Sequence, residues 1–98
     1  MEELKIKIIA KMSRRRHYAH KMINFSDLLR VVATNERGDA KRCIYELYKE
    51  GFLNRKPGVQ KEFRYSLRTE KQAEIDEMRC EYYGRHKEDT FNNDTFNV

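Results

Sequence analysis

The stretch from Asp39 to Leu67 constrains the fold of this chain more than any other part of the sequence. Its first half has apolar side chains at the i, i+3, i+4, i+7 spacing of one helix face, and these are Ala40, Cys43, Ile44 and Leu47. Gly51 follows where a helix commonly ends in a left-handed residue. We therefore predict a helix over about residues 39–50 that stops at Gly51.

The second half of this stretch, residues 52–67, predicts a β-hairpin. Phe52-Leu53 begins one strand, and in the other strand apolar and polar side chains alternate from Phe63 to Arg68, as on a half-buried strand. Pro57-Gly58 fits the two central positions of a type II turn, because Pro fixes φ and Gly accepts a positive φ. The segment from Lys56 to Lys61 is too long for the tightest turn, so we expect a projecting tip.

The N-terminal part predicts a helix over residues 2–14. Leu4, Ile8 and Met12 lie four residues apart, with Ile9 beside them, while lysines fall off this stripe. Residues 14–22 could extend the helix or form a basic loop, and the pattern leaves both alternatives open.

A second, short helix is expected over residues 27–33. Ser26 is a good N-cap, since its hydroxyl can accept a hydrogen bond from free amides of the first turn. Asp27 suits the positive end of the helix dipole. The charged break "TNERG", residues 34–38, contains turn-forming Asn and Gly, and Asp39 can cap the helix that follows.

The C-terminal third predicts one more helix and a tail. Thr69 can cap the helix, Gly84 closes it, and residues 84–98 are expected to be a flexible tail beyond a single domain of residues 1–83. Ile75, Met78 and Tyr82 form an apolar stripe. This stripe either covers the core or forms a dimer seam, and a core this small favours a homodimer.

Basic residues are concentrated in the first two thirds of the chain. Residues 1–68 carry 17 Lys and Arg against 8 Asp and Glu, a net charge of +9, whereas residues 69–98 carry 4 against 8, a net charge of −4. A basic surface attracts polyanions, chiefly nucleic acid and sometimes an anionic membrane. Ordinary solubilising charge explains the same numbers, so charge alone does not separate the two interpretations.

Residues 26–71 resemble the winged helix-turn-helix DNA-binding domains of bacterial and archaeal transcription regulators. The resemblance rests on the order helix, break, helix, hairpin, and on Leu47, Gly51, Phe52 and Leu53, which match the family's Leu-x-x-x-Gly-apolar-apolar pattern ahead of a basic wing. The segment "YSLRTEK" is similar to the exit from such a wing. The resemblance implies a mainly α fold with a β-hairpin (α+β), consisting of a three-helix core, a wing and a C-terminal helix.

The resemblance also implies double-stranded DNA as the partner. The predicted helix 39–50 would enter the major groove, where Arg pairs with guanine, and the wing would contact the backbone or the minor groove. Lys and Arg on a projecting turn can neutralise phosphates and release counterions, which supports the same interpretation on physical grounds. The residues that this implies as DNA contacts are Arg14, Arg15, Arg16, Arg37, Lys41, Arg42, Tyr45, Lys49, Arg55, Lys56, Lys61 and Arg64. For Arg37 and for the run Arg14 to Arg16, a solvated surface is an equally simple alternative.

Enzymatic activity and cofactors are not expected. The sequence lacks a Gly-rich phosphate loop and a His-Glu-x-x-His motif, and Cys43 and Cys80 form no close-spaced ligand motif with the three histidines. No apolar run approaches the roughly 20 residues of a membrane span, and the N-terminus lacks a signal-peptide layout, so we expect a cytoplasmic protein, associated with the nucleoid if it is prokaryotic. The alternative function is a winged-helix module that binds an acidic protein partner and no DNA.

Overall fold

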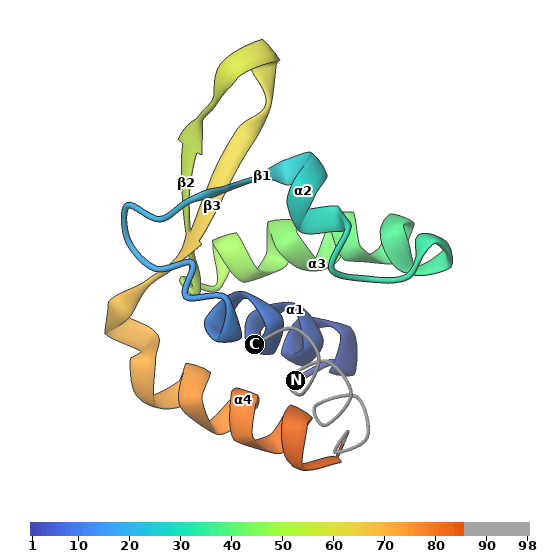
Figure 1. Ribbon diagram of the computed structural model, residues 1–98, viewed down its shortest axis with the longest axis vertical. Coiled ribbons are helices and arrows are strands. Elements are labelled where there is room, and N and C mark those ends of the chain that lie inside the picture. The colour runs from blue at the N-terminus through green and yellow to red at the C-terminus, as the bar shows by residue number, and fades with distance from the viewer. Residues whose placement is uncertain (86–98) are drawn as a thin grey trace.

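The computed structural model describes residues 1–85, and these form a mainly helical α+β fold with four α-helices and one three-stranded antiparallel sheet (Figure 1). This confirms the coarser part of the predicted fold class, a mainly α fold with a β-hairpin (α+β). The elements in chain order are α1 (Glu3–Arg14), β1 (Ile23–Asn24), α2 (Phe25–Leu29), α3 (Arg37–Lys49), β2 (Leu53–Pro57), β3 (Phe63–Leu67) and α4 (Gln72–Arg85). Most of the predicted tail, residues 86–98, lies outside the described residues.

Helix α1 is the central element, because it lies between α3 and α4 (Figure 1). Its sequence "IKIIAKM" carries apolar side chains on two sides. Ile8, Ile9 and Met12 belong to the main core with α3 and the sheet, while Ile6 and Ala10 pack with Tyr82 of α4. A helix that is apolar on more than one face needs a partner on each face, and α3 and α4 supply them.

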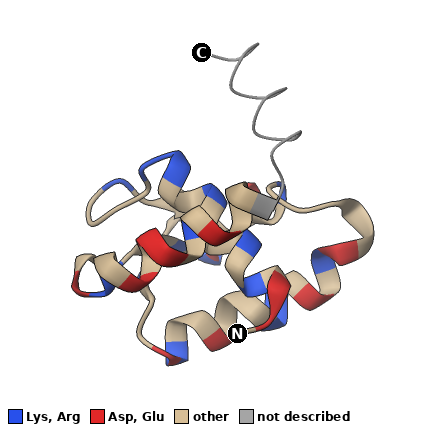
Figure 2. Cartoon of the chain, turned by 90° about the horizontal axis from the view of Figure 1, so that it is seen from below, with Lys and Arg blue, Asp and Glu red and all other residues tan. Residues whose placement is uncertain are grey.

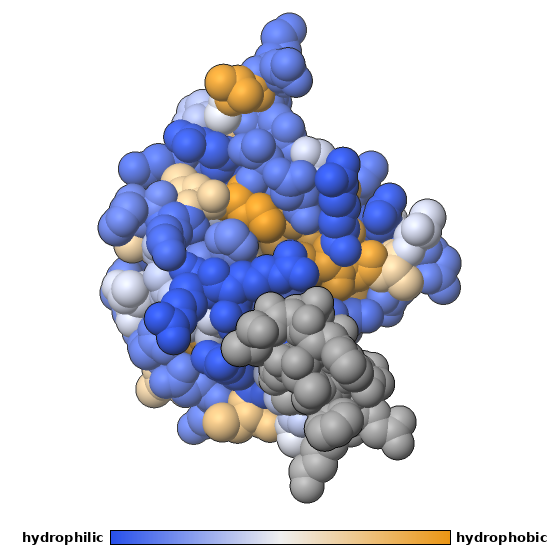
Figure 3. Space-filling view, in the orientation of Figure 1, coloured by the Kyte–Doolittle hydropathy of each residue, from blue (hydrophilic) through white to orange (hydrophobic). Residues whose placement is uncertain are grey.

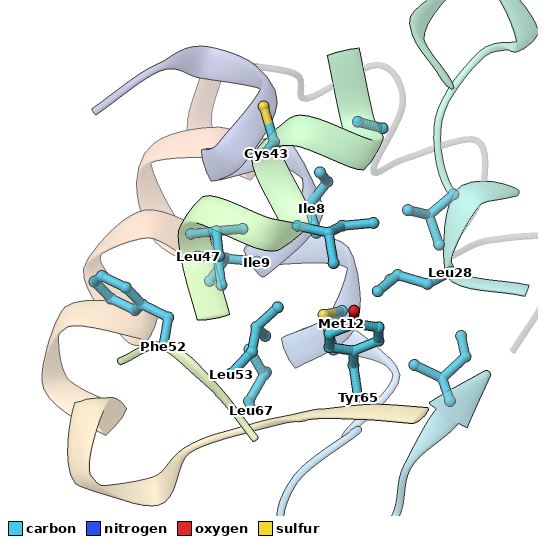
Figure 4. Close-up of a cluster of buried hydrophobic side chains, with 14 of the residues drawn as sticks. Ile8, Ile9, Met12, Leu28, Cys43, Leu47, Phe52, Leu53, Tyr65 and Leu67 are labelled. Atoms are coloured by element: carbon cyan, nitrogen blue, oxygen red, sulfur yellow. The ribbon is translucent and has the colours of Figure 1, made fainter. Parts of the chain in front are cut away.

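The main core lies between α1, α3 and the base of the hairpin (Figure 4). Leu28 of α2, Leu47 of α3 and the strand residues Leu53 and Leu67 are all almost completely buried. Phe52 closes the core beside Gly51, whose φ of +88° confirms the predicted left-handed helix end.

The sheet has the order β1-β3-β2, so β3 is its central strand. Cross-strand pairs join Leu53 to Leu67, Arg55 to Tyr65 and Lys56 to Arg64. The predicted alternation fails at Ser66, which is fully buried and accepts a hydrogen bond from the Asn54 side chain at 3.2 Å. Phe63, in contrast, is 41% exposed, because it lies near the tip and beyond the core.

Of residues 14–22, for which the pattern left two alternatives, Arg14 is the last residue of α1 and residues 15–22 form a loop. Arg16 and Ala19 take positive φ values of 60° and 51°, which are incompatible with a continued α-helix. Tyr18 forms a parallel bridge with Leu67, and its hydroxyl lies 2.9 Å from the Ser13 hydroxyl. The loop is thus tied both to α1 and to the base of the sheet.

The boundaries of the second and third helices differ from the prediction. Helix α2 spans only Phe25–Leu29, so Ser26 lies inside it and is not its N-cap. Val31 and Val32, expected on this helix, are buried in the turn that follows it. The predicted break forms a 3₁₀ turn at Thr34–Glu36, and α3 begins at Arg37, so Asp39 lies in its first turn and does not cap it.

The apolar stripe of α4 covers the core within one chain. Ile75 is 0% exposed and Tyr82 is 4% exposed, and Met78 packs against both apolar clusters. These side chains face α1, which favours the first of the two alternatives, cover of the core, and the homodimer stays a prediction. The helix also begins differently: Thr69 belongs to a 3₁₀ turn, Thr69–Lys71, and α4 continues through Gly84.

The hairpin turn is not the predicted type II turn. Pro57 is the last residue of β2, and Gly58 is extended, with φ −108° and ψ −167°. The left-handed residues are Gln60 and Lys61, with φ values of 58° and 62°. Gly58 is needed for another reason: a Cβ there would lie 2.6 Å from the backbone oxygen of Glu62.

We expect Gly58→Ala to lower the free energy of unfolding by about 1–3 kcal/mol, the usual range for forced overpacking. Urea unfolding followed by circular dichroism measures this. Gly38→Ala is the matched control, because nothing lies within 4 Å of a Cβ at that position in α3. The control should stabilise the protein by up to about 1 kcal/mol. Equal effects of the two variants would contradict the tight turn.

The surface seen in the orientation of Figure 1 is mostly hydrophilic, with an apolar band across the middle and an apolar spot near the hairpin tip (Figure 3). Val59, at this tip, is 74% exposed.

Within residues 1–85 no helix has the length and apolar character that a bilayer span requires.

Candidate functional site

The edge of α3 that faces the start of α1 is neutralised by ion pairs. Lys5 contacts Glu46 and Glu50 at 2.8 and 2.9 Å, and Arg42 contacts Glu2 and Glu46 at 2.7 and 3.1 Å. Acidic and basic residues accordingly occur close together along the helices (Figure 2). These pairs fix how α3 is oriented on α1, and they leave little net charge on this edge.

Arg42 was predicted as a base-reading residue, and the structure does not leave its guanidinium free for that role. Both terminal nitrogens are engaged: Nη2 donates to Glu2, and Nη1 donates to Glu46 one turn along the helix. Reading a base with Arg42 would require breaking these contacts. The sequence pattern placed Arg42 off the buried stripe, but only the position of Glu2 shows which neighbour it meets.

The same contacts shift the pKa values of their members. Hydrogen bonding with Arg42 holds the pKa of Glu2 below its ordinary value, and hydrogen bonding with Lys5 and then Arg42 lowers the pKa of Glu46. Burial, with Glu2 nearby, raises the pKa of the Cys43 thiol to about 11. A thiol that stays protonated at neutral pH suits packing better than nucleophilic chemistry.

The outer face of α3 carries Lys41, Tyr45 and Lys49, all of them exposed. Tyr45 is 51% exposed, and the Lys49 ammonium lies 5.7 Å from the centroid of its ring. Among the described residues, neither Lys41 nor Lys49 forms an ion pair with a carboxylate. This face therefore keeps its positive charge.

Arg55 connects α3 to the hairpin. Its guanidinium lies 4.1 Å from the centroid of the Tyr48 ring and 4.2 Å from that of Phe63. A cation held between two rings is stabilised by both ring faces and keeps its charge. Sequence reasoning missed Tyr48 and Phe63. The available signal was the interleaving of aromatic residues with cations from the end of the helix to the second strand.

The hairpin tip places like charges opposite one another. Lys56 and Arg64 are direct cross-strand partners, and both are exposed. Such a pair destabilises a hairpin in isolation. Lys61 is exposed beside them, and within residues 1–85 none of the three has a carboxylate partner. A tip that maintains this repulsion suits an anionic partner.

A pocket of about 530 Å³ lies along β2 and shares residues with this basic surface. Arg55, Lys56 and Arg68 line it, together with His20 and Tyr48. No Asp or Glu of the described chain lines it, but Arg68 is ion-paired with Glu70. Arg55 and Lys56 thus place this pocket beside the basic surface of the hairpin, and His20 places it beside the loop of residues 15–22.

The other predicted cations lie elsewhere. Arg14 stacks on Tyr83 of α4 at 5.4 Å, and Arg15 and Arg16 are exposed where α1 ends. Arg37 is the first residue of α3 and half-buried, and its Nε is buried without a hydrogen-bond partner in the described part of the chain. The structure therefore gives Arg14 a separate contact on α4, whereas Arg55 joins the hairpin to Tyr48 of α3.

Within residues 1–85, no three His, Cys, Asp or Glu side chains lie where they could together hold a metal ion. Cys43 and Cys80 are both free thiols.

We compared the chain with protein-family models, with curated proteins and with solved structures, and none of the three comparisons found a match.

Proposed function

We propose that this protein binds double-stranded DNA as a winged-helix domain and acts as a transcription regulator. The element order α1-β1-α2-α3-β2-β3-α4 and the sheet order β1-β3-β2 are compatible with that fold. In this assignment α3 is the recognition helix, and the hairpin of residues 53–67 is the wing. Two exposed elements that carry cations on one molecule can contact the groove and the phosphates together.

The observation that carries the proposal is the distribution of ion pairs. Lys5, Lys7 and Arg42, at the α1–α3 side, are neutralised by glutamates. The cations of the wing tip and of the outer face of α3 have no such partners among residues 1–85. A polyanion would supply the missing countercharge and release its own condensed ions.

A salt titration of binding to random duplex tests the proposal. We expect the logarithm of affinity to fall linearly with the logarithm of salt concentration, with a slope that reports the number of phosphate contacts. Lys56→Ala combined with Lys61→Ala should make this slope shallower by about 2 and weaken binding to all sequences alike, because phosphate contacts carry no sequence information.

Arg79→Glu is the matched control. It changes the net charge by the same amount as the double variant, at an exposed position of α4, and α1 lies between α4 and α3 (Figure 1). This control should keep the wild-type slope. Equal slopes for Arg79→Glu and the wing variant would mean that the wing does not contact phosphates. If neither duplex affinity nor its salt dependence is measurable, an acidic protein partner becomes the better candidate.

A further inference from the structure

A second pocket lies between the start of α2 and the wing, apart from the outer face of α3. It has a volume of about 320 Å³, at the lower end of the range for sites that hold a small organic group. Phe25 and Ser26 line it from α2, and Lys61, Glu62, Phe63 and Tyr65 line it from the wing. Tyr65 belongs to the main core and Phe25 packs against it, whereas the other four lining residues are not part of that core.

Three aromatic rings form the apolar part of this pocket. Phe25 and Tyr65 have ring centroids 6.1 Å apart and planes inclined by 48°. Phe63 is 41% exposed, and Arg55 packs over its ring at 4.2 Å. Arg55 is itself held against Tyr48, so the Phe63 ring is supported before any ligand arrives. A supported, partly exposed ring is a preformed surface for stacking.

The polar groups of the pocket complement a planar heterocycle that carries a phosphate. The backbone N–H of Ser26 donates to Glu62 Oε1, and hydrogen bonding from Ser26 lowers the pKa of Glu62. The carboxylate is thus ionised at neutral pH and held in place, with a second oxygen that can accept an N–H. Lys61 is exposed beside it and can meet a phosphate.

We propose that this pocket receives one unpaired nucleobase of the bound DNA. The base stacks on the exposed Phe63 ring beside Phe25, with the buried Tyr65 ring as the floor of the pocket, and its 5′ or 3′ phosphate lies against Lys61. An exocyclic amino group of the base donates to Glu62, as carboxylates accept from cytosine N4 in direct readout. This inference rests on the proposed DNA binding and adds a preference for DNA that presents an unpaired base.

A base of an intact duplex can enter the pocket only if its base pair opens, and unpairing costs a few kcal/mol. In a bulge, a frayed end or a single strand the base is already unpaired, so binding does not include this cost. We therefore expect tighter binding to a duplex with a single bulged base than to the same duplex without it. Adenine, cytosine and guanine carry an exocyclic amino group, and thymine does not, so a bulged thymine should bind less tightly.

The test uses the full chain and two duplexes of one sequence, one of them with a single bulged 2-aminopurine. We expect the bulged duplex to bind about 5–100-fold more tightly, the range for stacking one base on aromatic side chains. The fluorescence of 2-aminopurine should also be quenched on binding. Equal affinities, or no quenching, would overturn the inference while leaving duplex binding intact. Failure to bind any DNA would overturn both proposals.

Substitutions in and near the pocket test whether the preference for the bulged duplex arises there. Phe63→Ala should bring the affinity ratio of bulged to intact duplex close to 1, and Phe63→Tyr should keep most of it, because Tyr preserves the stacking face. Val59→Ala is the matched control, since Val59 is exposed at the same wing and does not line the pocket. Glu62→Gln should reduce the preference for bulged cytosine over bulged thymine. An unchanged ratio in folded Phe63→Ala would contradict stacking at this site.

Discussion

Replacing Ile75 with Asp is expected to unfold the protein or to lower its free energy of unfolding by more than about 4 kcal/mol, out of the 5–15 kcal/mol typical of a small domain. Ile75 is 0% exposed and belongs to the main core, so the substitution removes apolar contacts and buries a charge. An isolated buried carboxylate must either pay for desolvation or take up a proton. Guanidinium unfolding and near-UV circular dichroism measure the loss.

Ala73→Asp is the matched control, because Ala73 is exposed on the same helix. It should change the free energy of unfolding by no more than about 0.5 kcal/mol, as surface substitutions usually do. The expectation would be contradicted if the wild-type protein is a dimer and Ile75→Asp is a folded monomer of wild-type stability. In that case α4 packs on a second chain in solution, as in the dimer seam predicted from the sequence.

Lys41→Ala and Tyr45→Ala are each expected to cost about 1–3 kcal/mol on a selected binding site and much less on random duplex. Both side chains lie on the outer face of α3, exposed and without carboxylate partners within residues 1–85. Each substitution removes a contact to a base edge, and only the selected site has the base that makes this contact. Affinities for selected and random duplexes, measured at one salt concentration, give the ratio that tests this.

Arg42→Ala is the informative comparison for these two variants. Because Glu2 and Glu46 hold its guanidinium, its removal should leave the ratio of specific to non-specific affinity nearly unchanged. If Arg42→Ala lowers this ratio and the other two variants do not, the edge of α3 near α1 reads the DNA. The N-terminal residues of the chain would then have to move away from Arg42 on binding.

The proposed interface combines a rigid helix with a wing whose base is anchored. Gly51 turns the chain from α3 into β2, and Arg55 bridges Tyr48 of the helix and Phe63 of the wing. The orientation of the wing relative to α3 is therefore fixed by packing before DNA arrives. Less conformational entropy has to be lost on binding when the contacting elements are already ordered.

Local patterns in the sequence were sufficient for most of the fold. The 3.6-residue spacing of Ala40, Cys43, Ile44 and Leu47 predicted α3 and its buried face, and all four side chains are buried. Gly51 predicted the end of that helix, and Phe52-Leu53 and the alternation from Phe63 to Arg68 predicted the two strands, although the buried Ser66 departs from this alternation. These signals are local, because helix period, left-handed glycine and strand alternation depend on residues close in the chain.

What the sequence left undecided depends on residues that are distant in the chain. Ile75, Met78 and Tyr82 are equally suited to a core or a seam, and only the apolar second face of α1 shows that they are core. Arg42 is separated from Glu2 by 40 positions, and Arg55 from Phe63 by the hairpin turn, yet these contacts decide which cations are neutralised and which remain exposed. Periodicity tells which face of an element is buried, whereas the partner that each exposed side chain meets is set by tertiary packing.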